Sequence, residues 1–325
     1  NDMFMKIKTL FLGCLASMLF QAAYAQIGLD VYMKERSAKI DSLHYGIFFE
    51  DINHAADGGL YAELVRNRSF EDCDSVPLHW SLDTAGASAK MRLEGEGLLN
   101  PVQRKALKVE IASVDKSGKV ELANGGYWGI NAVKGRKYTL SLWAKAIGYK
   151  GTITASLQDK AGMATYATVR VTGKLKRGWQ KYTVELLSDA DDAQARLVLS
   201  MDAPGIVWMD MVSLFPPTFK GRENGCRPEL AQLLADMKPR FMRFPGGCFV
   251  EGEVIDGKLE QFKWKKSIGP IEERSSHINV WKYPVSNGLG YHEYLQLAED
   301  LGATPMYVTN VGIWHGGFAP HDSIE

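Results

Sequence analysis

The sequence has little cysteine, with four residues in 325. Cys14 lies in the N-terminal leader-like segment, which leaves Cys73, Cys226 and Cys248. Three cysteines without a short repeating spacing make neither a disulfide framework nor a tetrahedral zinc site. A single bond between Cys73 and Cys226 stays open, because exported proteins meet oxidising conditions.

An excess of charge is also absent, since 38 Lys and Arg residues balance 38 Asp and Glu residues. No run of basic residues marks a surface that follows phosphates, which argues against nucleic acid as a partner. A neutral sugar polymer fits this balance better. With 46% hydrophobic and 23% charged residues, the chain is long enough for two globular domains with their own cores.

No apolar run in the sequence is long enough to span a bilayer. The run at 10–20 follows Lys6 and Lys8 and precedes Ala23-Tyr24-Ala25, which is the charge, core and small-residue pattern of a secretory signal. We therefore predict a signal peptide over residues 1–25, export to the periplasm or the extracellular space, and no integral membrane segment after cleavage. A buried amphipathic helix is the alternative.

Three short apolar runs, at 45–49, 241–244 and 306–309, are typical of strands in a parallel sheet that is covered on both faces. Apolar residues at helical spacing predict two amphipathic helices between these strands, one from Pro228 onward and one over 291–301. Strands that alternate with helices predict βα units.

Residues 74–216 follow a different pattern, with short alternating segments separated by Gly, Asp and Lys turns. Every second side chain is apolar in residues 138–144, and the alternation recurs in 153–157 and 207–212. About eight strands without helices predict a β-sandwich. Because this segment interrupts the βα pattern, we expect a sandwich inserted after the first βα unit, with its two ends close together.

Several motifs resemble those of one family. They are HYGIFFEDI at 44–52, GGLYAEL at 58–64, FMRFPGGCFVEG at 241–252 and NGLGY at 287–291. Through them, residues 27–72 and 222–325 resemble the α-L-arabinofuranosidases of glycoside hydrolase family 51. The resemblance implies a (β/α)₈ barrel. The fold class is then α/β plus all-β, with the first three βα units of an incomplete TIM barrel and an inserted jelly-roll β-sandwich.

Four segments follow from this interpretation. They are a signal peptide at 1–25, the start of the barrel at 26–73, the sandwich at 74–216 and the continuation of the barrel at 217–325. The sandwich sequence, with Gly126-Tyr127-Trp128 and the stretch 210–215, resembles carbohydrate-binding modules of the family 4 and 9 type.

The resemblance also implies the chemistry. Family members are retaining glycosidases, in which one Glu protonates the leaving oxygen and a second Glu attacks the anomeric carbon. These residues end the fourth and seventh strands. A barrel takes about 250 residues, whereas roughly 160 remain here without leader and insert. We therefore expect no catalytic residue in this chain, both catalytic Glu residues downstream of Glu325, and no activity of the chain alone.

The candidate sugar site lies at the ends of the predicted strands, where barrel enzymes bind their substrates. By resemblance, Glu50 accepts hydrogen bonds from the hydroxyls of bound arabinose, and Gly246, Gly247, Cys248 and Asn310 line the same pocket. Other interpretations stay open: an ion pair at the rim for Glu50, a tight loop for the two glycines, and a buried thiol for Cys248.

Aromatic rings stack on sugar faces, and five are candidates for this contact. They are Trp128, Trp143 and Tyr166 in the sandwich, and Trp264 and Trp281 in the loop after the second barrel strand. Packing is the alternative for each of them. Asp210 resembles a position that holds structural calcium in similar modules. Otherwise we expect neither a cofactor nor a metal.

The function predicted for the intact relative is retaining hydrolysis of terminal arabinofuranosyl residues. Its partner would be a plant-type polysaccharide or oligosaccharide that contains arabinofuranose, such as arabinan or arabinoxylan. Two alternatives remain. One is another retaining glycosidase of the same barrel clan, and the other is a non-catalytic polysaccharide-binding protein that uses only the sandwich. The sequence says nothing of the oligomeric state.

Overall fold

The computed structural model describes residues 28–34, 38–172 and 174–318, so the predicted signal peptide lies outside the described residues. The chain divides into two units, one ending at Asp41 and the other beginning at Ser42. The helices and strands of the described part all belong to the second unit. Within that part, no helix is both long and apolar enough to cross a membrane.

A parallel sheet of three strands forms one part of the second unit. Its order is β1 (Ile47–Phe48), β13 (Phe241–Phe244) and β18 (Thr304–Tyr307), with Ile47 in register with Met242. β1 and β13 lie within the short apolar runs that predict them, whereas β18 begins two residues before its predicted run and overlaps it only at 306–307. Parallel strands need long crossover connections, which is what consecutive βα units supply. The barrel to which they would belong stays a prediction.

Two helices connect and cover these strands. The first, α2 (Pro228–Asp236), has its proline in the first turn, and the second, α4 (Tyr291–Leu301), ends at Gly302 in the left-handed conformation, with φ +65°. On its apolar face, Tyr294 stacks on Phe244 with ring centroids 5.1 Å apart. Both helices that the apolar spacing predicts are therefore observed.

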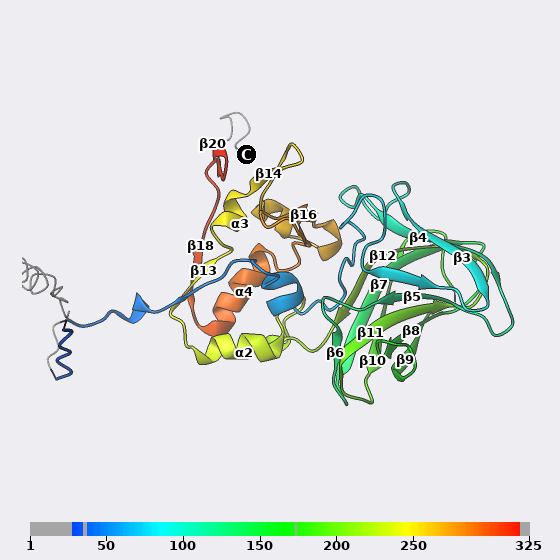
Figure 1. The fold of residues 1–325 in the computed structure, drawn as a ribbon, viewed down its shortest axis with the longest axis horizontal. Helices are drawn as coiled ribbons and strands as arrows, with labels where there is room; N and C mark the ends of the chain where they lie inside the picture. The colour runs from blue at the N-terminus through cyan, green and yellow to red at the C-terminus, as the bar shows by residue number, and fades with distance from the viewer. Residues whose placement is uncertain (1–27, 35–37, 173, 319–325) are drawn as a thin grey trace, which may run out of the picture. The chain divides into compact units, whose positions relative to one another are not determined.

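The other part is a β-sandwich of two antiparallel sheets, drawn from cyan to green in Figure 1. One sheet has the order β10-β7-β12-β4-β3, and the other has the order β2-β5-β11-β8-β9, with β6 paired to β11. The strands are β2 (Trp80–Asp83), β3 (Ala87–Glu94), β4 (Ala106–Val114), β5 (Val120–Asn124), β6 (Ile130–Ala132), β7 (Lys137–Ile147), β8 (Ile153–Gln158), β9 (Thr165–Thr172), β10 (Gln180–Leu187), β11 (Asp192–Met201) and β12 (Gly205–Phe215).

Alternating burial holds the two sheets together. β7 buries every second residue from Tyr138 to Ala144, as predicted. The alternation predicted for the end of β12 is wrong. Pairing with β7 shifts after Asp210, Met211 has a φ of +47°, and Val212 donates its N–H to the carbonyl of Arg68 at 2.9 Å. With the extra residue of this bulge, four consecutive side chains, from Met209 to Val212, are buried.

The chain enters and leaves the sandwich through neighbouring segments. Tyr61 forms an antiparallel bridge with Cys226, and the N–H of Leu64 donates to the carbonyl of Leu214 at 3.0 Å. The sandwich strands therefore occupy the stretch of chain between β1 and β13, which pair with each other. This arrangement is consistent with an insertion, while the segment boundaries stay predictions.

Short elements fill the loops, mostly between β13 and α4. They are α3 (Cys248–Glu251), the hairpins β14 (Glu253–Ile255) with β15 (Lys258–Glu260), β16 (His277–Ile278) with β17 (Pro284–Val285) and β19 (Ile313–Trp314) with β20 (Gly317–Phe318), and the single turns η1 (Ser42–His44), η2 (Ala56–Leu60), η3 (Phe219–Gly221), η4 (Trp264–Ser267) and η5 (Ile271–Glu273).

The three cysteines of the described residues are free. Cys226 is buried among apolar side chains, and burial raises the pKa of its thiol to about 12. Cys73 instead contacts Ser75, with 3.3 Å between Sγ and Oγ. The bond between Cys73 and Cys226 that the sequence left open is therefore not formed.

Candidate functional site

Glu50 links the ends of the first two parallel strands. It follows β1, and its Oε1 accepts hydrogen bonds from the N–H of Gly247 at 2.8 Å and of Phe249 at 2.9 Å. Within the described part of the chain, Oε2 has no hydrogen bond and the carboxylate has no ion pair, so the alternative of a rim ion pair is not observed. Oε1 is thus fixed by backbone donors, whereas Oε2 has no partner among the described residues.

Gly246 is required by its contact with Glu50. Its φ of +144° is one that residues with a side chain rarely adopt, and a Cβ there would lie 2.6 Å from Oε1 of Glu50. Gly247 differs, because a Cβ on it would meet no atom within 4 Å. The Pro-Gly-Gly motif therefore combines a tight turn with close approach to the carboxylate.

The substitution Gly246→Ala tests this arrangement. We expect it to lower the free energy of unfolding by about 1–3 kcal/mol, because of the positive φ and the displaced carboxylate. Gly247→Ala is the matched control, with an expected change within about 0.5 kcal/mol. Urea denaturation of both variants measures the difference. Equal losses would show that Gly246 is not held against Glu50.

Cys248 is the first residue of α3, directly after these glycines. Its side chain is exposed, so the alternative of a buried thiol is wrong. Partial desolvation, followed by the carboxylates of Glu50 and Glu251, raises the pKa of the thiol. The group is therefore a neutral thiol beside Glu50, and its contact with sugar stays a prediction.

Asn310 ends the third strand region and organises the loop after it. Its Nδ2 donates to the carbonyls of Val250 at 2.9 Å and Ile313 at 2.7 Å, and its Oδ1 accepts from the N–H of Gly312 at 2.5 Å. Both amide hydrogens are used within the protein. In this arrangement Asn310 supports α3, which carries Cys248, instead of offering a free donor to a sugar.

Four of the five candidate aromatic rings are partly buried. Trp264 and Trp281 pack against the small cluster around Phe249, and Tyr166 packs on the sandwich core while its hydroxyl donates to Asp192 at 2.9 Å. Packing is thus observed for these three. The indole N–H of Trp143 is buried and has no partner in the described structure.

Trp128 is the exception, with 61% of its surface exposed. It lies in the loop between β5 and β6, and its ring meets the edge of His54, from the segment after β1, at 5.5 Å between centroids. His54 in turn stacks on Tyr283 at 4.0 Å. An exposed indole held from one side is suited to stacking on a sugar ring.

Asp210 does not fit a calcium site. It is fully buried, its Oδ1 accepts the N–H of Met211 at 2.7 Å, and its Oδ2 has no partner among the described residues. Burial raises the pKa of this carboxyl well above its usual range, which disfavours the charged form that a calcium ion would need. No group of three His, Cys, Asp or Glu residues in the described chain surrounds a metal position, whereas calcium takes six to eight oxygens.

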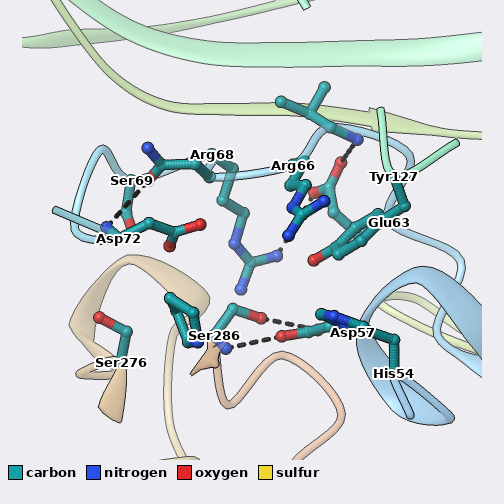
Figure 2. Close-up of a pocket in the computed structure, with 13 residues that line it drawn as sticks. His54, Asp57, Glu63, Arg66, Arg68, Ser69, Asp72, Tyr127, Ser276 and Ser286 are labelled. Carbon is teal, nitrogen blue, oxygen red and sulfur yellow. Dashed lines mark hydrogen bonds and ion pairs between the residues drawn. The ribbon is translucent and has the colours of Figure 1, made fainter. Parts of the chain in front are cut away.

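Sequence reasoning missed a cluster of buried and half-buried ionisable side chains, here called the junction cluster, which consists of Asp57, Glu63, Arg66, Arg68 and Asp72 (Figure 2). Arg68 and Glu63 form an ion pair at 3.4 Å, with both side chains 3% exposed. Burial raises the pKa of Glu63, and the Arg68 guanidinium opposes this shift.

Glu63 also links the segment that enters the sandwich to the segment that leaves it. Its Oε1 accepts the N–H groups of Val65 and Leu214, each at 2.9 Å, and its Oε2 accepts the hydroxyl of Ser213. The cavity beside the cluster is only about 20 Å³, which is too small for a sugar. The junction cluster is therefore structural. A buried Glu in the motif GGLYAEL was its only sequence signal.

Two carboxyls of this region, one of them in the junction cluster, have raised pKa values. Burial, with a smaller contribution from the charge of Asp57, raises the pKa of Asp51 to about 8 and that of Asp72 to about 7. Asp57 itself accepts the N–H of Ser286 at 2.6 Å and its hydroxyl at 2.9 Å, as Figure 2 shows. These bonds tie the segment after β1 to the loop before α4.

Comparisons with known proteins identify relatives of the chain. The family described as the alpha-L-arabinofuranosidase 1 domain matches residues 233–324. Alpha-L-arabinofuranosidase 1 of Arabidopsis thaliana is 41% identical over 83% of this chain and 41% of its own length. An extracellular exo-alpha-L-arabinofuranosidase of Streptomyces chartreusis is 40% identical over 84% of this chain and 33% of its own length.

A solved structure supports the same relationship. An arabinose-bound GH51 α-L-arabinofuranosidase matches 89% of this chain and 47% of its own length, with 32% identity and a TM-score of 0.80. By homology, the chain is related to the α-L-arabinofuranosidase glycosidases. It spans less than half the length of the relatives named here.

Proposed function

We propose that the protein to which this chain belongs hydrolyses terminal α-L-arabinofuranosyl residues of arabinan or arabinoxylan, with retention of configuration. The relatives named above are arabinofuranosidases, and one of them is extracellular, which supports both the activity and export. The chain would contribute part of the sugar pocket from the ends of β1, β13 and β18, the first three strands of the proposed barrel.

The position of Glu50 carries this proposal. Its carboxylate spans the ends of β1 and β13 with one oxygen held by two N–H groups, so its orientation is fixed before a ligand binds. A pre-oriented carboxylate oxygen accepts hydrogen bonds from sugar hydroxyls and discriminates between sugars by hydroxyl position. Cys248 lies beside it, and Gly246 allows the close approach.

Retaining hydrolysis needs a carboxylic acid and a carboxylate nucleophile on opposite sides of the glycosidic bond, about 5 Å apart. In the proposed mechanism Glu50 takes neither role. It holds and orients the sugar, while the acid and the nucleophile come from strands other than β1, β13 and β18. Exposed Trp128 on the sandwich would provide a separate contact for polysaccharide.

The test is an assay of the intact protein on an aryl α-L-arabinofuranoside, with the anomer of the released sugar followed by NMR. We expect hydrolysis with retention by the intact protein and none by residues 26–325 alone. An aryl β-D-xyloside and an aryl cellobioside are the competing substrates. Preference for either of them, or inversion of configuration, would contradict the proposal and favour another glycosidase of the same clan.

A further inference from the structure

A groove of about 640 Å³ lies on the sandwich, and its lining includes none of the strand-end residues Glu50, Gly246 and Cys248. It crosses the sheet that contains β2, β5, β11 and β8, and its lining includes Trp128, Ser81, Gln194, Arg196 and Lys160. The groove has room for two or three sugar units, since ligand pockets commonly measure about 300–1,000 Å³. Of its lining residues none carries a carboxylate.

Arg196 brings a positive charge to the floor of this groove. Its neighbours Ala195 and Leu197 belong to the sandwich core, so Arg196 lies on the opposite face of β11. Its Nη2 donates to Oε1 of Gln158 at 3.1 Å, whereas its Nε is buried without a partner in the described structure. A buried guanidinium donor without an acceptor is costly, and a ligand oxygen would remove this cost.

Lys160 adds a second positive charge from the turn after β8. Its side chain is exposed, and neither Lys160 nor Arg196 forms an ion pair with another described residue. The charge of Arg196 acts on Asp159, the residue before Lys160, whose Oδ1 accepts the N–H of Ala164 at 2.7 Å. Asp159 thus offsets part of the charge of Arg196, but no carboxylate lines the groove in which the two cations lie.

The remaining lining is suited to a sugar. Trp128 presents an exposed indole, and Gln194 is fixed beside it because its Nε2 donates to the carbonyl of Trp128 at 2.9 Å. His79 adds a neutral ring, since burial and the charge of Arg66 lower its pKa. A ring platform with polar side chains around it is the usual composition of a carbohydrate contact.

We propose that this groove binds oligosaccharides that carry carboxylates, that is, glycans with uronic acid units. The indole of Trp128 stacks on one sugar ring, and the guanidinium of Arg196 and the ammonium of Lys160 receive the carboxylate of a neighbouring unit. Such acids occur on side chains of xylan and in pectic backbones. The groove would thus hold the protein on acidic polysaccharide while the strand-end site acts on neutral arabinofuranose.

Calorimetric titration of the full chain tests the proposal with trigalacturonate, with a xylotriose that carries one glucuronic acid, and with the carboxyl-reduced form of each. We expect both acidic ligands, or one of them, to bind at least tenfold more tightly than the reduced forms. The acid that binds identifies the source, pectic or xylan-like. Raising the salt concentration should weaken binding of the acid and leave the neutral ligand unaffected.

Variants locate the site. Lys160→Gln with Arg196→Gln should remove the preference for the acid, and Trp128→Ala should weaken both acidic and neutral ligands. Arg170→Gln is the matched control, because Arg170 is an exposed cation on β9 of the same sheet but outside the groove. Lys160→Gln alone, at an exposed turn, keeps the test valid if the Arg196 variant unfolds.

Three results would overturn the proposal. They are the absence of binding to either acid, equal affinity for acidic and carboxyl-reduced ligands, and an equal loss in the Arg170 control. Because the measurement is binding and not hydrolysis, its failure would leave the activity proposed for the strand-end site untouched.

Discussion

The substitution Glu63→Ala is expected to lower the free energy of unfolding by about 3–5 kcal/mol, because it leaves a buried charge without its partner. Arg68 would lose its counter-charge at a site where both side chains are 3% exposed. The N–H groups of Val65 and Leu214 would also lose their acceptor. Each unsatisfied buried donor adds to the cost.

Chemical denaturation of the full chain measures this loss. Glu185→Ala is the matched control, since Glu185 pairs with Lys137 at 3.0 Å but both side chains are at least 60% exposed. A surface pair contributes at most about 1 kcal/mol. If the two variants lost the same stability, the junction cluster would not be the tie between sheet and sandwich that its contacts indicate.

The second large effect concerns Glu50→Gln in the intact protein. We expect kcat/KM on an aryl arabinofuranoside to fall about 30- to 200-fold, which corresponds to about 2–3 kcal/mol for hydrogen bonds to a charged group. The carbonyl oxygen of Gln still accepts the N–H groups of Gly247 and Phe249. The amide nitrogen then replaces Oε2 and offers no acceptor to the sugar hydroxyls.

Because the backbone contacts survive, the melting temperature should barely change. Glu251→Gln is the control, since Glu251 lies on α3 and pairs with His315 at 3.3 Å while its side chain is 46% exposed. Its expected effect on kcat/KM is below about fivefold, in line with a surface pair. Unchanged kinetics with lowered stability in the Glu50 variant would remove Glu50 from the sugar site.

The sequence predicts those parts of the fold that depend on local patterns. The helical spacing before Gly302 and the alternation along β7 are properties of neighbouring residues, and both are observed. The bulge in β12 depends on a bond between Val212 and the carbonyl of Arg68, which is far away in the sequence. A short stretch of sequence does not contain both partners of this bond. The alternating pattern therefore predicts a regular strand up to Val212, where the structure has a bulge.

In the candidate site, too, local motifs identify some residues, while other features depend on the three-dimensional structure. Glu50, Gly246 and Gly247 were found through motifs, and the structure brings them together. The exposure of Cys248 and the loop bonds of Asn310 depend on how α3 is placed, which no motif specifies. In the junction cluster the partners are even more distant, with 151 positions between Glu63 and Leu214 and 229 between Asp57 and Ser286.

The bonds of Glu63 have a consequence for the order of folding. Pairing of β1 with β13 closes a very long loop, and the entropic cost of closure grows by about 0.6 kcal/mol with each doubling of loop length. Once the sandwich is folded, Leu64 and Leu214 are already adjacent, so only the segments 49–63 and 215–240 remain in the loop that pairing of β1 with β13 closes. The loop to be closed is then shorter than the full stretch between β1 and β13, which lowers the entropic cost of forming the parallel sheet. We infer that the sandwich acts as an internal template whose early folding speeds the pairing of these strands.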